Sequence, residues 1–404
     1  MSQQLTSAEI KAPETYDVVV VGGGPSGATA AHDLARQGHK VLLLDKAGRI
    51  KPCGGAIPPR LMRDFDIPEH QLVAHATSAR MIAPSDKVVD MPIEGGYVGM
   101  VDRETFDEWL RERARLSGAK RQKGSFERIE RDGDGTALVC YTTDSDALHQ
   151  VRARAVIGAD GARSKVARQS VKGADKIPCV FAYHEIIAMP KDGLAGFEPN
   201  RCDIYYQGHL SPDFYAWIFP HGDTASVGVG SAQKGFSLRG AIKTLRASSG
   251  LAGCETIRTE GAPIPLKPLK KWDNGRDIIV AGDAAGVVAP SSGEGIYYAM
   301  VAGREAGIAV SEMLATGKAS ALAGARKRFM RAHGKVFWVL GIMQYFWYRS
   351  DKRRERFVTM CADPDVQHLT WQAYMNKELV RAKPAAHARI FLKDMGHLLG
   401  LSPS

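Results

Sequence analysis

The sequence lacks a run of about 18 uncharged apolar residues, which is the length that a membrane-spanning helix needs. Its longest candidate, residues 336–348, has thirteen residues, includes Gln344 and is too short to span a bilayer. The first fifteen residues contain Glu9 and Lys11 and no apolar block, so we expect no signal peptide. These absences predict a cytoplasmic protein.

Cysteine is scarce, with six among 404 residues. No two cysteines form a CxxC pair, and none has the spacing of a zinc site. We therefore expect reduced thiols, no disulfide framework and no metal site.

Acidic residues are scarce only near the C-terminus. Residues 325–404 hold 15 Lys/Arg and 6 Asp/Glu, which accounts for +9 of the net charge of +10, and they also hold 11 of the 31 aromatic residues. No helix-turn-helix, zinc or RNP-type pattern accompanies this charge, so nucleic-acid binding is not expected. Two interpretations stay open: a helical cap with a solvated basic face, or an anchor on a membrane surface. The residues concerned are Phe337, Trp338, Tyr345, Phe346, Trp347, Tyr348, Arg349 and the cluster 352–356.

A strand–helix–strand pattern lies near the N-terminus. Residues 15–21 form a β-branched run, residues 25–37 are helical in character, and residues 40–45 form a second apolar run. The turn between the first two has the GxGxxG pattern at Gly22, Gly24 and Gly27. These glycines permit a tight turn, close approach of a pyrophosphate, and close packing of helix on strand.

Asp45 ends the second strand, and Lys46 follows it. A carboxylate at that position accepts hydrogen bonds from an adenosine ribose. The pattern therefore predicts a dinucleotide site that includes both residues.

Two later motifs favour FAD over NAD. Asp160 and Gly161 follow an expected strand at 155–158, and Asp283 follows one at 278–282, which ends at Gly282. Gly293 and Gly295 then precede a long small-residue helix, expected at 294–314, whose N-terminus could face the flavin ring. Either Asp alone would more often be a turn former.

These motifs resemble the FAD-dependent hydroxylase and reductase superfamily, which includes aromatic hydroxylases and geranylgeranyl reductases. The resemblance implies that Asp160 and Asp283 lie around the flavin. It also implies that Arg103, at the start of an amphipathic helix expected at 103–117, contacts the cofactor. Asp45 departs from the pattern, because these flavoproteins usually carry Glu there.

Two further stretches resemble the geranylgeranyl reductase family, closest to its chlorophyll and bacteriochlorophyll branch. "KPCGGAIPPRLMRDFDIP" contains Cys53, Gly54 and Gly55, and "FYAWIFP" contains Tyr215, Trp217 and Phe219. Taken alone, Cys53 would more often be a buried apolar residue, and the aromatic alternation would be one face of a strand. The resemblance implies that Gly54, Gly55 and the three aromatic residues contact substrate.

The resemblance also implies the reaction: three of the four double bonds of a geranylgeranyl group are reduced, which gives phytyl. Cys53 is the leading candidate for proton donation or for positioning at the flavin, with Tyr215 as a weaker one. The substrate is geranylgeranyl diphosphate or a geranylgeranylated chlorophyll or bacteriochlorophyll. NADPH is the expected electron donor, although no second GxGxxG is present. The alternatives are an archaeal-type reductase of isoprenoid lipids, a flavin monooxygenase of an aromatic substrate, and a non-catalytic flavin or pigment carrier.

The predicted fold is α/β, with a discontinuous Rossmann-like FAD-binding domain at 12–75, 100–175 and 275–325. An antiparallel substrate-binding sheet is expected at 76–99 and 176–274, followed by a helical basic-aromatic region at 326–404. We expect a bacterial enzyme, cytoplasmic and peripherally associated with the inner or photosynthetic membrane.

Overall fold

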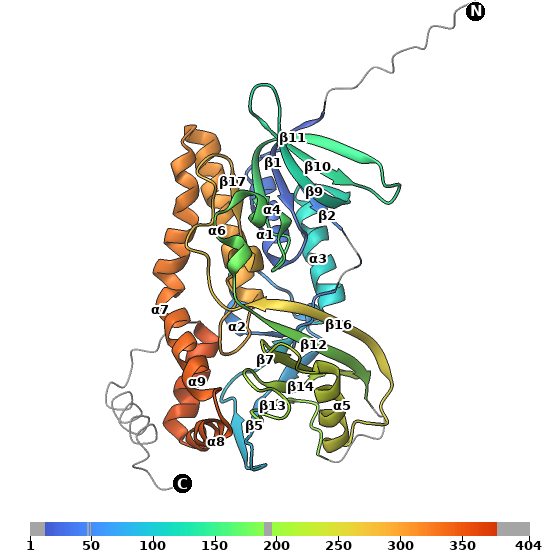
Figure 1. Ribbon diagram of the computed structural model, residues 1–404, viewed down its shortest axis with the longest axis vertical. Helices are drawn as coiled ribbons and strands as arrows, with labels where there is room; N and C mark the ends of the chain where they lie inside the picture. The colour runs from blue at the N-terminus through green and yellow to red at the C-terminus, as the bar shows by residue number, and fades with distance from the viewer. Residues whose placement is uncertain (1–12, 47, 49, 190–195, 378–404) are drawn as a thin grey trace, which may run out of the picture.

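The computed structural model describes residues 13–46, 48, 50–189 and 196–377. It contains two large sheets and several long helices. In Figure 1 the first sheet and its helices lie in the upper part and the second sheet lies below. The fold class is therefore the α/β arrangement expected from the sequence.

The first sheet has seven strands. They are β1 (Thr15–Val21), β2 (Val41–Asp45), β8 (Lys120–Lys123), β9 (Ser125–Arg131), β10 (Ala137–Thr142), β11 (Leu148–Gly158) and β17 (Ile278–Val280). Five strands are parallel in the order β8-β2-β1-β11-β17, whereas β10 and β9 extend antiparallel from β11. Because the carboxyl ends of parallel strands meet at one edge, the glycine-rich turn and both Asp motifs come together there.

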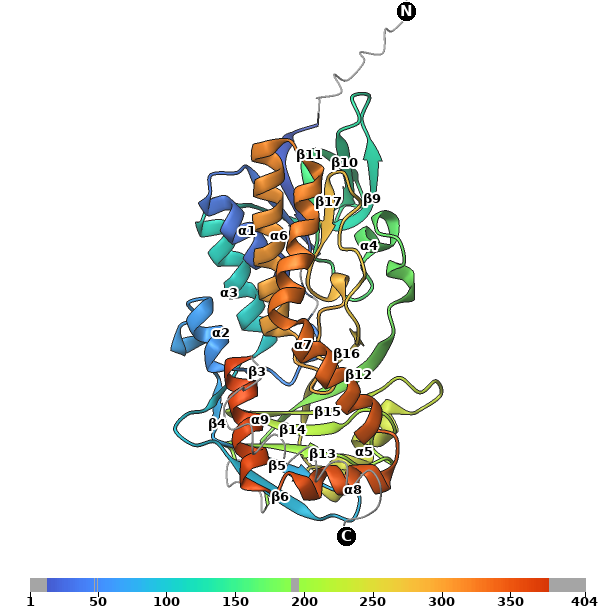
Figure 2. The same ribbon diagram turned by 90° about the vertical axis from the view of Figure 1, so that its left-hand side faces the viewer.

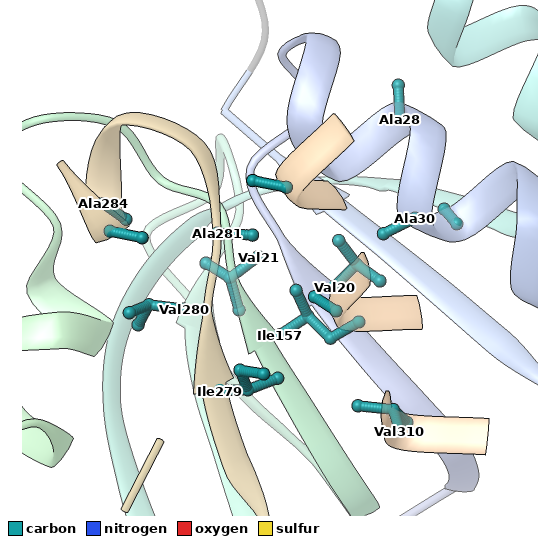
Figure 3. Close-up of a cluster of buried hydrophobic side chains, with 14 of the residues drawn as sticks. Val20, Val21, Ala28, Ala30, Ile157, Ile279, Val280, Ala281, Ala284 and Val310 are labelled. Atoms are coloured by element: carbon teal, nitrogen blue, oxygen red, sulfur yellow. The ribbon is translucent and has the colours of Figure 1, made fainter. Parts of the chain in front are cut away.

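Small residues allow helices to pack closely on this sheet. The helices are α1 (Pro25–Arg36), α3 (Arg103–Leu116) and α6 (Ile296–Thr316). Figure 3 shows side chains of β1, β11 and β17 beside Ala30 of α1 and Val310 of α6. A side chain at Gly303 would overlap the Ser26 carbonyl oxygen, which explains how α6 and α1 approach each other.

The second sheet is antiparallel apart from one pair, β13 with β5. Its order is β16-β12-β15-β14-β13-β5-β6. The strands are β5 (Ser78–Ile82), β6 (Val88–Pro92), β12 (Cys179–Ala188), β13 (Arg201–Tyr205), β14 (Ala216–His221), β15 (Thr224–Ser231) and β16 (Thr256–Pro265). A helix that the sequence reading missed, α5 (Leu238–Ser248), covers one face with Ile242 and Leu245.

The remaining short elements connect these parts. A small sheet contains β3 (Ala56–Ile57), β4 (Ala74–Ala76) and β7 (Val98–Met100). The short helices among them are α2 (Pro59–Asp64) and α4 (Lys165–Ser170). The 3₁₀ helices are η1 (Glu69–Gln71), η2 (Ala174–Lys176), η3 (Gly282–Ala285) and η4 (Ala319–Leu322). The domain boundaries expected from the sequence stay a prediction.

The C-terminal region is helical as far as the structure describes it. It consists of α7 (Ala323–Trp347), α8 (Asp351–Met360) and α9 (Pro364–Asn376), while residues 378–404 lie outside the described residues. Figures 1 and 2 show α7 running alongside both sheets. Phe337 packs in the core around the first sheet, and Trp347 and Tyr348 pack in a cluster beside the second sheet. Within the described chain, no helix combines the length and apolarity that crossing a membrane requires.

Candidate flavin and substrate site

A cavity of about 390 Å³ lies where the carboxyl edge of the first sheet meets the second sheet. Its walls bring together most of the residues singled out from the sequence. These are Gly22, Gly24, Asp45, Lys46, Cys53, Gly54, Arg103, Asp160, Gly161, Tyr215, Trp217, Phe219, Asp283, Gly293 and Gly295. Gly27, Gly55 and Gly282 are outside its lining.

The glycine-rich turn has a separate steric reason for each glycine. Gly22 has φ +103°, and a side chain there would overlap the Ala159 carbonyl. A side chain at Gly27 would overlap the Gly22 carbonyl, so this glycine lets α1 pack on β1. Gly24 has nothing within 4 Å of an added Cβ and lines the cavity, so its missing side chain leaves the backbone open to a ligand.

Asp45 ties the same turn to β2. Its Oδ2 accepts a hydrogen bond of 2.6 Å from the Gly23 N–H. Arg111, which the sequence reading missed, has its Nη1 3.9 Å from Asp45 Oδ1 and donates to the Gly23 carbonyl at 3.3 Å. Arg111 lies eight residues after Arg103 on α3, and this helical spacing was the available signal. Both residues line the cavity.

The two Asp motifs differ in their surroundings. Asp160 caps α4 by accepting from Ser164 Oγ at 2.5 Å and from the Lys165 N–H at 2.7 Å, and burial raises the pKa of its carboxyl. Asp283 pairs with Lys51. Lys51 was missed, although it stands two residues before Cys53 and lines the cavity.

The Gly293–Gly295 turn opens α6 beside the aromatic residues. Gly293 has φ +64°, and an added Cβ would lie 3.2 Å from Tyr215 Oη. Glu294, inside this turn, accepts from the Tyr297 N–H at 3.1 Å and forms a 2.6 Å ion pair with Lys377. Both charged side chains are almost fully buried, at 5% and 4% exposure. The end of α9 is therefore attached to the cavity wall, a contact that no local pattern signalled.

The Cys53-Gly54-Gly55 segment packs against β14. A side chain at Gly54 would lie 2.5 Å from the Phe219 ring, and one at Gly55, with φ +74°, would lie 2.5 Å from His221 Nε2. The Gly55 N–H points to Cys53 Sγ at 3.3 Å. Gly54 is thus explained by close approach to the second sheet, and Gly55 by close approach to both His221 and the Val101 carbonyl. The half-buried Cys53 thiol is held at the cavity.

Arg103 is buried between Asp107 and the Cys53 region. Its Nε and Nη2 donate to the two Asp107 oxygens at 2.8 and 2.7 Å. Burial opposes the charged guanidinium, but Asp107 and the nearby Cys53 side chain raise the pKa of Arg103 above its ordinary value. The ion pair fixes a permanent cation in the cavity wall.

Tyr215, Trp217 and Phe219 form a row of rings along one face of the second sheet. Ring centroids are 5.9 Å apart for the first pair and 6.4 Å for the second. Burial raises the pKa of Tyr215, whose hydroxyl donates to the Ser292 carbonyl at 2.6 Å. The row gives the cavity an apolar wall next to Cys53.

A buried polar network contacts the indole nitrogen of Trp217. The Trp217 indole donates to Ser226 Oγ at 3.1 Å, and that oxygen lies 2.9 Å from His184 Nδ1. Glu260 contacts the other nitrogen of His184. The sequence reading missed this network because its members come from four strands.

These features fit FAD. A family profile described as FAD binding domain matches residues 15–180. A geranylgeranyl diphosphate reductase from Rhodobacter capsulatus is 58% identical over 388 residues, which cover 96% of this chain and 98% of the relative. The chain belongs to the geranylgeranyl diphosphate reductase family.

A second relative agrees with this membership, and a solved structure agrees with the fold. A geranylgeranyl diphosphate reductase from Synechocystis is 36% identical over 403 residues, covering 95% of this chain and 97% of the relative. The structure of a geranylgeranyl bacteriochlorophyll reductase-like protein from Thermoplasma acidophilum superposes with a TM-score of 0.80 at 22% identity. It covers 96% of this chain and 98% of that protein. The roles of individual site residues stay predictions.

Proposed function

We propose that this protein reduces the geranylgeranyl chain to phytyl in chlorophyll or bacteriochlorophyll synthesis. The observation that carries the proposal is the contact of the Cys53-Gly54-Gly55 segment with Phe219 at the edge of the FAD cavity. An apolar wall of rings suits a polyprenyl tail, and one slot of this kind accepts the tail in successive registers.

The reaction adds a hydride to one carbon of an isolated alkene and a proton to the other. When bound and reduced, FAD supplies the hydride, with NADPH as the proposed source of electrons. Cys53 is the proposed proton donor: its Sγ–H gives a proton to the second carbon, and the thiolate is reprotonated from solvent between turnovers. Tyr215 is the poorer candidate because its hydroxyl already donates to Ser292.

The cavity walls serve the same step. Arg103, held by Asp107, places a guanidinium group beside Cys53 in the cavity wall. The rings of Trp217 and Phe219 exclude water from the tail and align it. Lys51, Asp283 and the Gly293–Gly295 turn border the part of the cavity assigned to FAD.

The test is reduction of geranylgeranyl diphosphate, geranylgeranylated bacteriochlorophyll and a geranylgeranylated glycerolipid, in parallel and without oxygen. C53A should retain FAD and lose roughly a hundredfold or more in turnover, as expected for a general acid. Cys254 is a matched control, because it is a half-buried free cysteine outside the cavity. Normal turnover by C53A would eliminate Cys53. Reduction of the glycerolipid alone, or oxygen-dependent hydroxylation, would refute the proposed function.

We also propose that α7 docks this enzyme on an anionic membrane surface. Trp338, Ile342, Tyr345 and Phe346 recur at helical spacing and are 69%, 36%, 59% and 36% exposed. Arg349 lies over the Tyr345 ring at 4.9 Å. Aromatic residues beside cations suit the headgroup region of a bilayer that contains anionic lipid.

Not all of the basic-aromatic tail is available for this role. Phe337, Trp347 and Tyr348 are core residues, and buried Arg354 pairs with Asp351 at 2.6 Å. The helical-cap interpretation therefore describes these residues. The membrane proposal is confined to the exposed face of α7 and to Arg349 and Arg353, which lie over its Tyr345 and Phe346 rings.

Vesicle sedimentation tests the docking. Each cation near the surface contributes about 1 kcal/mol, so R349Q/R353Q should bind vesicles with anionic lipid roughly tenfold or more weakly, and less so at high salt. K172Q, which removes an exposed charge elsewhere, should bind normally. Equal binding of all variants to neutral and anionic vesicles would contradict the proposal.

A further inference from the structure

A second cavity, of about 360 Å³, lies next to the first. Both cavities are lined by Arg163 and by Ala262 and Pro263 of β16, so only this strand and the Arg163 side chain separate them. The second cavity continues over β12 to the start of α5. The two cavities therefore adjoin along β16 and Arg163.

Two arginines in this cavity lack a carboxylate partner among the residues that the structure describes. Arg163 and Arg239 form no ion pair with any described residue. Nearby Arg246 pairs with Glu185 at 2.6 Å, and Arg258 pairs with Asp102, Glu104 and Glu260. The chain therefore neutralises the neighbouring arginines and leaves these two positive.

Aromatic rings hold both guanidinium groups in place. Arg163 lies over the Phe181 ring at 5.7 Å, and Arg239 lies over the Tyr183 ring at 5.6 Å. Phe181 and Tyr183 are two residues apart on β12, so they share a face and stand about 7 Å apart. Two guanidinium groups over neighbouring rings of one strand face suit the oxygens of a phosphorylated group.

The same cavity offers an apolar surface for the rest of such a ligand. Phe181 is 44% exposed, and Phe236 and Tyr183 also line the cavity. Exposed rings next to unpaired arginines suit a flat base or a prenyl chain attached to phosphate.

We propose that the second cavity binds the phosphate groups of an organic phosphate ester that reacts in the first cavity. This inference rests on the proposed function, which offers two ligands of this chemistry: the nicotinamide dinucleotide that reduces FAD, and geranylgeranyl diphosphate. Arg239 is the specific contact, because it lines the second cavity and not the first.

The experiment compares R239Q, R163Q and K243Q holoenzymes. Lys243 is the matched control, since it is an exposed cation on α5 outside the cavity. One arm measures the KM for NADPH in anaerobic flavin reduction. The other arm uses dithionite as reductant and measures two KM values, one for geranylgeranyl diphosphate and one for geranylgeranylated bacteriochlorophyll, which lacks the diphosphate.

R239Q should raise one KM roughly tenfold to a hundredfold, as loss of a charge-assisted hydrogen bond predicts, with K243Q unchanged. A rise for NADPH identifies the dinucleotide, and a rise for the diphosphate but not the pigment identifies the prenyl substrate. If both arginine variants match K243Q in both arms, the inference is wrong. Failure of the proposed function is seen separately, as absent tail reduction by the dithionite-reduced wild-type enzyme.

Discussion

Replacing Lys377 by methionine removes the cation from the buried ion pair with Glu294. The two side chains are 4% and 5% exposed and their charged atoms lie 2.6 Å apart. Loss of one partner leaves a carboxylate without its counter-ion in a dry environment, so K377M should lower the free energy of unfolding by about 3–5 kcal/mol. The double variant K377M/E294Q removes both charges and should recover a large part of that loss.

A surface pair provides the control. Lys123 and Asp144 lie 2.7 Å apart but are 59% and 79% exposed, so K123M should change the free energy of unfolding by at most about 1 kcal/mol. Denaturant unfolding of the holoenzymes measures all four proteins, and FAD fluorescence reports release of the cofactor. If K377M costs no more than K123M, or if the double variant is no more stable than K377M, the reasoning is refuted.

Three other substitutions have distinct expected results. G24V should fold normally but lose FAD, because its side chain projects into the cavity, whereas G27A should be destabilised by about 1–3 kcal/mol through overlap with the Gly22 carbonyl. The opposite pattern in unfolding and FAD-retention assays would contradict this. Burial lowers the pKa of His221 to about 4, so the unfolded chain binds a proton that the folded protein does not between pH 6.5 and 4. The free energy of unfolding of the wild-type protein should therefore fall by up to about 3 kcal/mol as the pH drops over that range, and that of H221Q should fall less. Parallel pH profiles of the two proteins would contradict this role of His221.

The sequence predicts best what depends on neighbours along the chain. The glycine-rich turn, β1, α1 and β2 follow from local periodicity, whereas Cys53 and Tyr215 entered the predicted site through the resemblance of two short stretches to a known family. Contacts between distant segments have no such signal. Lys51 with Asp283, Arg111 with Asp45 and Lys377 with Glu294 form only after folding brings separate elements together. α5 was missed because it interrupts a stretch whose flanks alternate as strands do.

The C-terminal region shows how one composition serves different purposes. A basic and aromatic segment has the same composition whether its rings are buried or exposed, and only tertiary contacts divide Trp347 from Trp338. Because α7 runs beside both sheets and α9 ends on the Gly293–Gly295 turn, the exposed face of α7 is connected through rigid helices to the flavin cavity. Docking of that face on a bilayer would therefore hold the cavity at a fixed position relative to the lipid, which is where a polyprenyl tail is available. The described C-terminal residues thus fall into two groups: those that pack in the core, such as Trp347, and the exposed residues of α7, such as Trp338, for which we propose contact with lipid.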